Sequence, residues 1–137
     1  MRADYRPNVL IVDNDDRALW RFQELLEHRG MSTRATWSGH EALAMLRSGE
    51  FDVLLVDDYL PDVHAHDFLE RVNRLVMHPP VVVMHSKPPT HSDLQSYASV
   101  GVEQLVNKSD AENVCRAVVL CCGQQHSASK PASKTVH

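Results

Sequence analysis

The sequence contains no long apolar run and no block of positive charge. None of its apolar runs approaches the roughly 20 residues of a membrane-spanning helix, and its start lacks the apolar centre of a signal peptide. The 137 residues include 14 Lys and Arg against 18 Asp and Glu, which gives a net charge of −4. We therefore expect a cytoplasmic protein that contacts neither membranes nor nucleic acid directly.

Cysteine is also scarce, and its placement excludes a disulfide framework. Cys115, Cys121 and Cys122 are the only cysteines, and they fall together in the expected last helix without zinc-site spacing. In a reducing compartment such residues serve as small apolar packing groups. The length of 137 residues suits one domain, which at this size buries about two-thirds of its unfolded surface.

One stretch organises the rest of the chain. Four apolar residues, 53–56, run directly into Asp57 and Asp58, and Pro61 closes the segment. A short apolar run of this kind predicts a strand buried on both faces, and such strands form parallel sheets covered by helices on both sides. Ligands of these sheets gather at the carboxyl ends of the strands. Alone, the two acids are equally compatible with a solvated turn.

Two further strand ends carry charge. The expected strand 8–12, with four apolar residues at 9–12, leads into the acidic segment 13–16, and a later strand over 102–107 ends at Lys108. Carboxylates that cluster at one sheet edge repel one another unless they share a cation or a proton. An all-oxygen cluster suits Mg²⁺, and a lysine suits a phosphate or a carboxylate. Together these strand ends indicate a site.

The whole chain alternates between strand and helix patterns. The expected strands are residues 8–12, 32–37, 53–56, 81–84 and 102–107. The first expected helix begins at Asp15 or Asp16. The next three span residues 38–47, 66–77 and 92–100, and the last one ends near Cys122. Strict alternation predicts an α/β fold with right-handed crossovers and helices on both sheet faces. The pattern alone does not give the strand order.

Several local features are also expected. The helix over 66–77 should bury five apolar residues: Phe68, Leu69, Val72, Leu75 and Val76. Ser109 and Glu112 have the spacing of a capping box at the start of the last helix. Residues 1–7 form a lead-in, 8–122 the domain, and 123–137 a polar tail that we expect to be disordered, with no output domain beyond it.

The ordered set of strand-end residues resembles the receiver domain of two-component response regulators over residues 8–122. The segments that carry the resemblance are Val9–Asp15, Ser38–Leu43, Val53–Asp57 with Pro61, Ser86, and Gly101 with Leu105–Lys108. The resemblance implies a flavodoxin-like (βα)5 fold with a five-stranded parallel sheet in the order 2-1-3-4-5. That order brings the ends of the first and third strands together.

The resemblance also implies a function in phosphorelay signalling. Asp57 would accept a phosphoryl group from a sensor histidine kinase or a phosphotransfer protein, and Pro61, four residues on, selects Asp57 over Asp58. Lys108 would pair with Asp57 and then with the phosphoryl group, while the Ser86 hydroxyl would bond another phosphoryl oxygen. The implied Mg²⁺ ligands are Asp13, Asn14, Asp57 and the backbone carbonyl of Tyr59.

The same resemblance implies a signalling protein rather than an enzyme. At most, the chain would catalyse its own phosphorylation and dephosphorylation, and it would act on a downstream protein through direct contacts. The sequence does not name that partner or the cognate kinase.

The sequence departs from the family pattern at several positions. Asn14 stands where the family usually has a second acidic metal ligand, so the affinity for Mg²⁺ should be lower unless Asp15 compensates. Leu105 replaces the aromatic switch residue, Ser109 replaces a proline, and His64 with Ala65 replaces an Asp-Gly pair. These changes affect the metal site and the switch, whereas the acceptor and the lysine are intact.

The hydroxyl position is ambiguous by one residue. Counting forward from Pro80 places His85 there, whereas counting back from Lys108 places Ser86 there. We prefer Ser86.

Two other functions compete with phosphorelay. One is a degenerate receiver that binds a partner without phosphorylation, which Asn14 and Leu105 favour. The other is a small phosphatase of the haloacid dehalogenase type, because Asp13 and Asp15 have the spacing of its nucleophile and acid. The threonine that follows in that family is absent. His64 and His66 could bind a metal only with a third ligand, which the spacing does not indicate.

Overall fold

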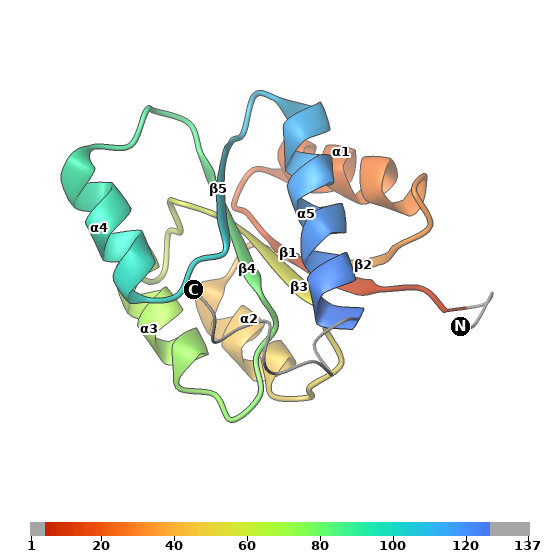
Figure 1. The fold of residues 1–137 in the computed structure, drawn as a ribbon, viewed down its shortest axis with the longest axis horizontal. Helices are drawn as coiled ribbons and strands as arrows, with labels where there is room; N and C mark the ends of the chain where they lie inside the picture. The colour runs from red at the N-terminus through yellow and green to blue at the C-terminus, as the bar shows by residue number, and fades with distance from the viewer. Residues whose placement is uncertain (1–4, 127–137) are drawn as a thin grey trace.

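The computed structural model describes residues 5–126, which form one parallel sheet with helices on both faces (Figure 1). The five strands are β1 (Asn8–Val12), β2 (Ser32–Thr36), β3 (Val53–Asp57), β4 (Val81–His85) and β5 (Gln104–Asn107). The five helices are α1 (Asp16–Glu27), α2 (Gly39–Leu46), α3 (Ala65–Asn73), α4 (His91–Ser99) and α5 (Ala111–His126). The strand order is β2-β1-β3-β4-β5, so the flavodoxin-like prediction is confirmed.

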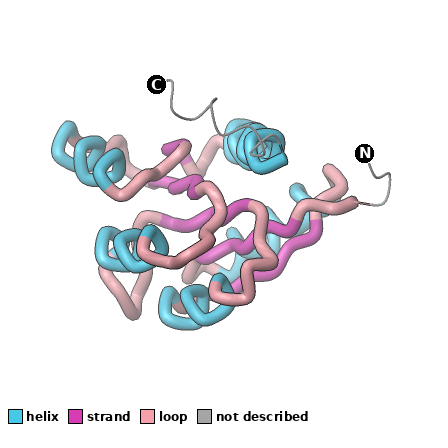
Figure 2. The backbone as a smooth tube through the Cα atoms, turned by 60° about the horizontal axis from the view of Figure 1, so that its bottom comes forward, coloured by secondary structure: helices cyan, strands magenta, loops and turns pink. Residues whose placement is uncertain are grey.

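The sheet separates two apolar cores, one on each face. Along β1, Val9 and Ile11 pack with residues of α1 and α5, whereas Leu10 and Val12 pack with residues of α2 and α3. Figure 2 shows the strands enclosed between these layers of helices. Because both faces are covered, all five residues of β3 are buried. This burial explains why the strands appear in the sequence as continuous apolar runs rather than alternating ones.

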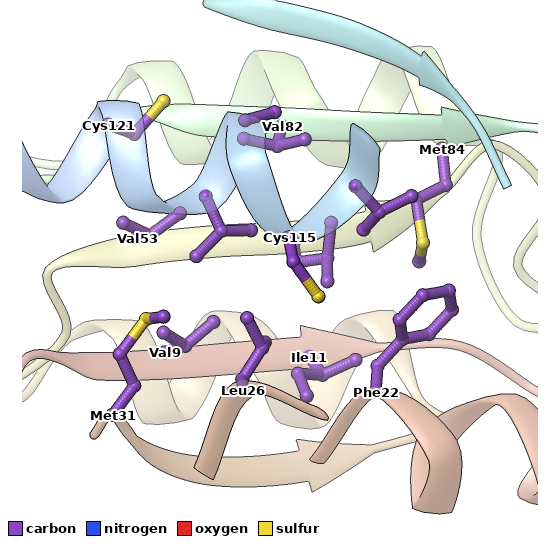
Figure 3. Packing of buried hydrophobic residues seen from close by; sticks show 14 of the residues in the cluster. Val9, Ile11, Phe22, Leu26, Met31, Val53, Val82, Met84, Cys115 and Cys121 are labelled. Atoms are coloured by element: carbon purple, nitrogen blue, oxygen red, sulfur yellow. The ribbon is translucent and has the colours of Figure 1, made fainter. Parts of the chain in front are cut away.

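The core beneath α1 and α5 contains the cysteines. Figure 3 shows Cys115 and Cys121 of α5 among Phe22 and Leu26 of α1 and the strand residues Val9, Ile11, Val53, Val82 and Met84. All three cysteines are buried and free, and Cys122 Sγ lies 4.0 Å from Met31 Sδ. Burial raises the pKa of Cys121 to about 12. These thiols are therefore packing groups, as the sequence indicated.

Helix α3 ends earlier than the sequence predicted. It stops at Asn73, and Val76, which was expected to be buried, is fully exposed at 100%. The N–H groups of Arg74 and Leu75 donate to carbonyls three residues earlier, at 3.2 and 3.0 Å. Such short-range bonds tighten and end a helix. The prolines that follow then lead the chain into β4 in extended form.

The last helix is capped differently from the prediction and is longer. The Ser109 hydroxyl donates to Asn107 Oδ1 at 2.8 Å, and Asp110 Oδ1 accepts from Asn113 N–H at 3.1 Å, so Asp110 caps α5 in place of the predicted Ser109–Glu112 box. A capping box forms instead at α4, between Thr90 and Asp93.

The helix also extends the ordered domain. Helix α5 continues to His126, four residues beyond the boundary expected at Cys122. The polar tail was expected to be disordered, and its residues 127–137 lie outside the described residues. Within 5–126, no helix combines the length and apolar character needed to cross a membrane.

Candidate functional site

Three charged side chains meet at the carboxyl ends of the strands. Asp13 directly follows β1, and its N–H donates to the carbonyl of Thr36 at 3.1 Å. Asp57 is the last residue of β3, the neighbour of β1. Lys108 follows β5, and its N–H donates to the carbonyl of His85 at 2.8 Å. Asp13 and Asp57 are 44 positions apart in the chain, and Asp57 and Lys108 are 51 positions apart. Pairing of the parallel strands in this order brings the three residues together.

Lys108 joins the two carboxylates. Its Nζ lies 2.6 Å from Asp13 Oδ2 and 3.3 Å from Asp57 Oδ1. The side chains of Asp13 and Asp57 are only 0% and 7% exposed. Charges buried to this extent are costly unless they are paired, so the ammonium group is what allows two carboxylates to remain close together here.

The site perturbs the acid–base behaviour of its members. Burial, together with the charge of Asp13, raises the pKa of Asp57 to about 6, although Lys108 acts in the opposite direction. Burial alone would lower the pKa of Lys108, but its hydrogen bond and charge contacts with Asp13 and Asp57 outweigh this effect and raise it. Lys108 is therefore a cation at neutral pH, and Asp57 is ionised but under electrostatic strain.

The donor atoms at this edge fit a hard cation. Among the described residues, the Lys108 ammonium is the partner of both Asp13 Oδ2 and Asp57 Oδ1, and these two buried oxygens have no other donor there. Asn14 is exposed beside them. Mg²⁺ is commonly held by one or two carboxylates with water completing its shell. Asp13, Asp57 and the Asn14 amide oxygen fit such a site.

Other potential ligands are already engaged or too few. Asp15 is the nearest further carboxylate to the site. Its Oδ1 accepts from Arg17 N–H at 3.1 Å and caps α1, so this side chain is already engaged. His64 Nδ1 accepts from His66 N–H at 3.3 Å at the start of α3. Across residues 5–126, no group of three or more His, Cys, Asp or Glu side chains is placed to hold a metal ion.

The structure separates the two candidates at the end of β4. Ser86 is exposed and lines a cavity of about 370 Å³ together with Arg17, Arg21 and Lys108. His85 is still part of β4 and pairs with Asn107 in the register. Ser86 therefore lies beside the lysine but not within the ion-paired cluster, and its predicted role is untested by the geometry.

One residue near the site was missed in the sequence. Asp62, in the loop between β3 and α3, accepts hydrogen bonds from Ser38 Oγ, Gly39 N–H and His40 N–H at 2.9, 2.9 and 3.0 Å. Burial opposes ionisation of Asp62, but these hydrogen bonds hold its pKa well below the usual range.

Two further contacts join the loop around Asp62 to the start of α2. The Nδ1 atom of His40 lies 2.8 Å from Asp62 Oδ2, and any side chain added at Gly39 would collide with Val63. The loop after Asp57 is thus fastened to the start of α2. A carboxylate placed just after Pro61 was the only sequence signal for this contact.

Comparison with known proteins identifies the class. A family model for the response regulator receiver domain matches residues 9–119, and the chain belongs to this family. The response regulator SaeR of Staphylococcus aureus (strain USA300) is 26% identical over 101 residues, which cover 74% of this chain and 43% of that relative. The chain thus spans less than half the length of the curated relatives it matches.

Solved structures show the same fold. A CheY-like receiver domain protein from Methanospirillum hungatei JF-1 superposes with a TM-score of 0.83 at 19% identity, over 90% of this chain and 99% of that one. The chemotaxis response regulator CheY4 of Vibrio cholerae gives a TM-score of 0.77 at 20% identity, over 85% and 99%. At these identities the likeness concerns the fold.

Proposed function

We propose that this chain accepts a phosphoryl group on Asp57 from a sensor histidine kinase or a phosphotransfer protein. Receiver domains of response regulators take part in phosphorelay signalling. The observation that carries the proposal for this chain is the buried pair of carboxylates, Asp13 and Asp57, held by Lys108 at 2.6 and 3.3 Å. A domain that needed only a stable fold would gain by replacing such a cluster with apolar residues.

The chemistry follows from the position of Asp57. Its carboxylate is the nucleophile, and it attacks the phosphorus of a phosphohistidine or a small phosphodonor while the P–N or P–O bond to the donor breaks. The product is an acyl phosphate. Because the nucleophile must be ionised, its raised pKa of about 6 still leaves it mostly reactive at neutral pH.

Lys108 stabilises both the reactant carboxylate and the phosphorylated product. Before transfer its ammonium pairs with Asp57, and after transfer the negative charge resides on the phosphoryl oxygens, which the same ammonium can reach. Positive charge placed where negative charge develops is the main source of catalysis in phosphoryl transfer. Lys108 therefore positions the nucleophile and neutralises the product.

Receiver domains generally bind Mg²⁺ at the phosphorylation site. In this chain Asp13 and Asp57 would hold the ion, together with the Asn14 amide oxygen and the Tyr59 backbone carbonyl. When bound, Mg²⁺ supplies positive charge that offsets the charge of the incoming phosphoryl group. Because an amide brings no charge, Asn14 should make this site weaker than one with a third carboxylate.

Output would take place through contacts with a downstream protein. Leu105 on β5 carries no aromatic ring, so the loops next to the acceptor are expected to transmit the signal: residues 58–66 and 86–92. Of the rival functions, phosphatase activity is disfavoured because Asp15, the required acid, caps α1. A receiver that is never phosphorylated would have no use for the strained Asp57.

Chemical trapping tests the proposal directly. After incubation with acetyl phosphate and Mg²⁺, borohydride reduces an aspartyl phosphate to homoserine, which peptide mass analysis locates. We expect homoserine at position 57 and unmodified Asp58 in the same peptide. Homoserine at position 58, or no conversion under conditions that label a known receiver, would refute the assignment.

A further inference from the structure

A cavity of about 370 Å³ opens next to the acceptor site. Residues from the start of α1, between positions 15 and 22, line one side, and Ser86 with residues 107–109 line the other. Lys108 belongs to both places, because it lines the cavity and its ammonium holds Asp13 and Asp57. A volume of this size is typical of sites for small molecules, so the cavity can hold a compact organic ligand.

Two arginines that line the cavity have no acidic partner. Arg17 and Arg21 are four residues apart on α1, so their side chains lie on the same face of the helix. Within residues 5–126 neither guanidinium forms an ion pair, whereas that of Arg29 does. Asp15 also lines the cavity, but its Oδ1 accepts from Arg17 N–H at the start of the helix. The two guanidinium groups are therefore available to an anion from outside the chain.

The positions of these arginines do not serve the helix. Arg17 is the second residue of α1, where the partial positive charge of a helix start disfavours a cation. Like charges four residues apart also destabilise a helix. A phosphate group between Arg17 and Arg21 would reverse both effects, because it brings negative charge to the helix start and separates the two cations. The unfavourable pattern thus indicates an anionic ligand.

Neutral donors and apolar carbon complete the lining. Asn107 Oδ1 accepts from the N–H and the Oγ–H of Ser109 at 2.9 and 2.8 Å, which fixes the orientation of the amide. The Nδ2 group of Asn107 is a donor on the same amide. Ala18 and Phe22 of α1 are buried and also line the cavity. Cations, donors and apolar carbon together suit a phosphate that carries a small organic group, rather than a bare inorganic ion.

We propose that this cavity binds a small organic phosphate: Arg17 and Arg21 hold the phosphate oxygens, and the organic group lies against Ala18 and Phe22. The planar guanidinium group pairs with two phosphate oxygens at once, which a lysine ammonium does not. The site is separate from the acceptor, and no phosphoryl group is transferred from this ligand.

The ligand would regulate the acceptor through Lys108, and this effect rests on the proposed function. A dianion in the cavity brings negative charge to the residue whose ammonium must neutralise Asp57 and the incoming phosphoryl group. Like charges repel more strongly where they are partly removed from water. Bound ligand should therefore slow phosphorylation of Asp57, and phosphorylation should weaken ligand binding by the same factor that ligand binding disfavours phosphorylation at equilibrium.

The binding test uses the full chain with phenylphosphonate, whose P–C bond cannot serve as a phosphodonor. EDTA is present, so the probe cannot bind through a metal ion at the acceptor site. Calorimetry compares the wild type with Arg17→Gln, Arg21→Gln and the control Arg71→Gln. Arg71 is exposed on α3, which packs on the other face of the sheet. Urea unfolding of each variant checks that it is folded.

We expect Arg17→Gln and Arg21→Gln each to weaken binding roughly 10-fold, the effect of losing one hydrogen bond between charged groups. Arg71→Gln should leave the affinity within about 2-fold, and inorganic phosphate should bind more weakly than phenylphosphonate. Equal weakening by all three variants would mean non-specific attraction to positive charge and would overturn the site. Equal affinity for inorganic phosphate would overturn the assignment of an organic group.

The wild type also tests the location without any variant. Backbone amide resonances of residues 17–22, 86 and 107–109 should shift when phenylphosphonate is added. Shifts confined to other segments, or none with the probe in large excess, would overturn the proposal.

The regulatory effect is measured as the initial rate of labelling by acetyl phosphate and Mg²⁺. Saturating phenylphosphonate should slow the wild type roughly 5-fold, the lower end of the usual coupling between two sites. The double variant Arg17→Gln/Arg21→Gln should be slowed less than about 2-fold. Equal slowing of both proteins would place the inhibitor at the acceptor itself and overturn the regulation. If the wild type is not labelled even without the probe, the proposed function fails, whereas binding in EDTA is judged independently of that result.

Discussion

Replacing Asp57 with asparagine removes a carboxylate that the fold holds in an unfavourable environment. Burial and the neighbouring Asp13 raise the pKa of Asp57 from 3.8 to about 6. The folded protein therefore binds the proton of Asp57 more tightly than the unfolded chain does. Asparagine has the same shape and no charge, so Asp57→Asn is expected to stabilise the protein while it abolishes phosphorylation.

The size and the pH dependence of the effect follow from the same shift. A difference of about 2 pKa units corresponds to about 3 kcal/mol when Asp57 is fully ionised. Because the folded pKa is the higher one, this penalty is absent below the unfolded pKa near 3.8, grows as pH rises toward 6, and is complete above it. We expect Asp57→Asn to raise the free energy of unfolding by about 2–3 kcal/mol at pH 8.

Urea unfolding followed by circular dichroism measures this difference, with EDTA present to exclude divalent cations. The wild type, Asp57→Asn and the surface control Glu24→Gln are compared at pH 8 and pH 4.5. The gain from Asp57→Asn should shrink strongly at the lower pH, and Glu24→Gln should show no comparable change. If Asp57→Asn is less stable than the wild type at pH 8, Asp57 is not strained and Lys108 fully compensates its burial.

Three further predictions concern the metal site, the contact of Asp62 with the start of α2, and the segments that transmit the signal. Asn14→Asp should tighten Mg²⁺ binding by about 1–3 kcal/mol, measured by calorimetry, because it adds a negative charge to the donor set; unchanged affinity would mean that position 14 is not a ligand. Asp62→Ala should lower the free energy of unfolding by about 1 kcal/mol, the usual cost of losing a helix cap, and should speed amide exchange in residues 58–66; unaltered exchange would show that the loop does not depend on this contact. On phosphorylation, changes in amide exchange should concentrate in residues 58–66 and 86–92, and a maximum within 103–122 would show that the last strand and helix carry the signal despite Leu105.

Much of the fold could be predicted because it depends on local patterns in the sequence. The apolar runs that end in Asp13, Asp57 and Lys108 follow from burial on both sheet faces. Their convergence in space follows once the strand order is known, and the order came from the resemblance. The cluster of Asp13, Asp57 and Lys108 was therefore accessible from the sequence as a set of strand ends.

The remaining features depend on distances that no local pattern encodes. Ser109 prefers the nearby Asn107 amide, so Asp110 becomes the helix cap. Asp62 finds its donors 22 to 24 residues earlier in the chain. The choice between His85 and Ser86 depends on where β4 ends, and a count of residues across a loop of variable length cannot decide it.

The central claim is that Asp57 is the phosphoacceptor, and intact-mass measurement after incubation with acetyl phosphate and Mg²⁺ tests it most directly. The wild type and Asp58→Asn should each gain the mass of one phosphoryl group, which is lost again on treatment with hydroxylamine, and Asp57→Asn should gain none. Labelling that persists in Asp57→Asn but disappears in Asp58→Asn would contradict the account.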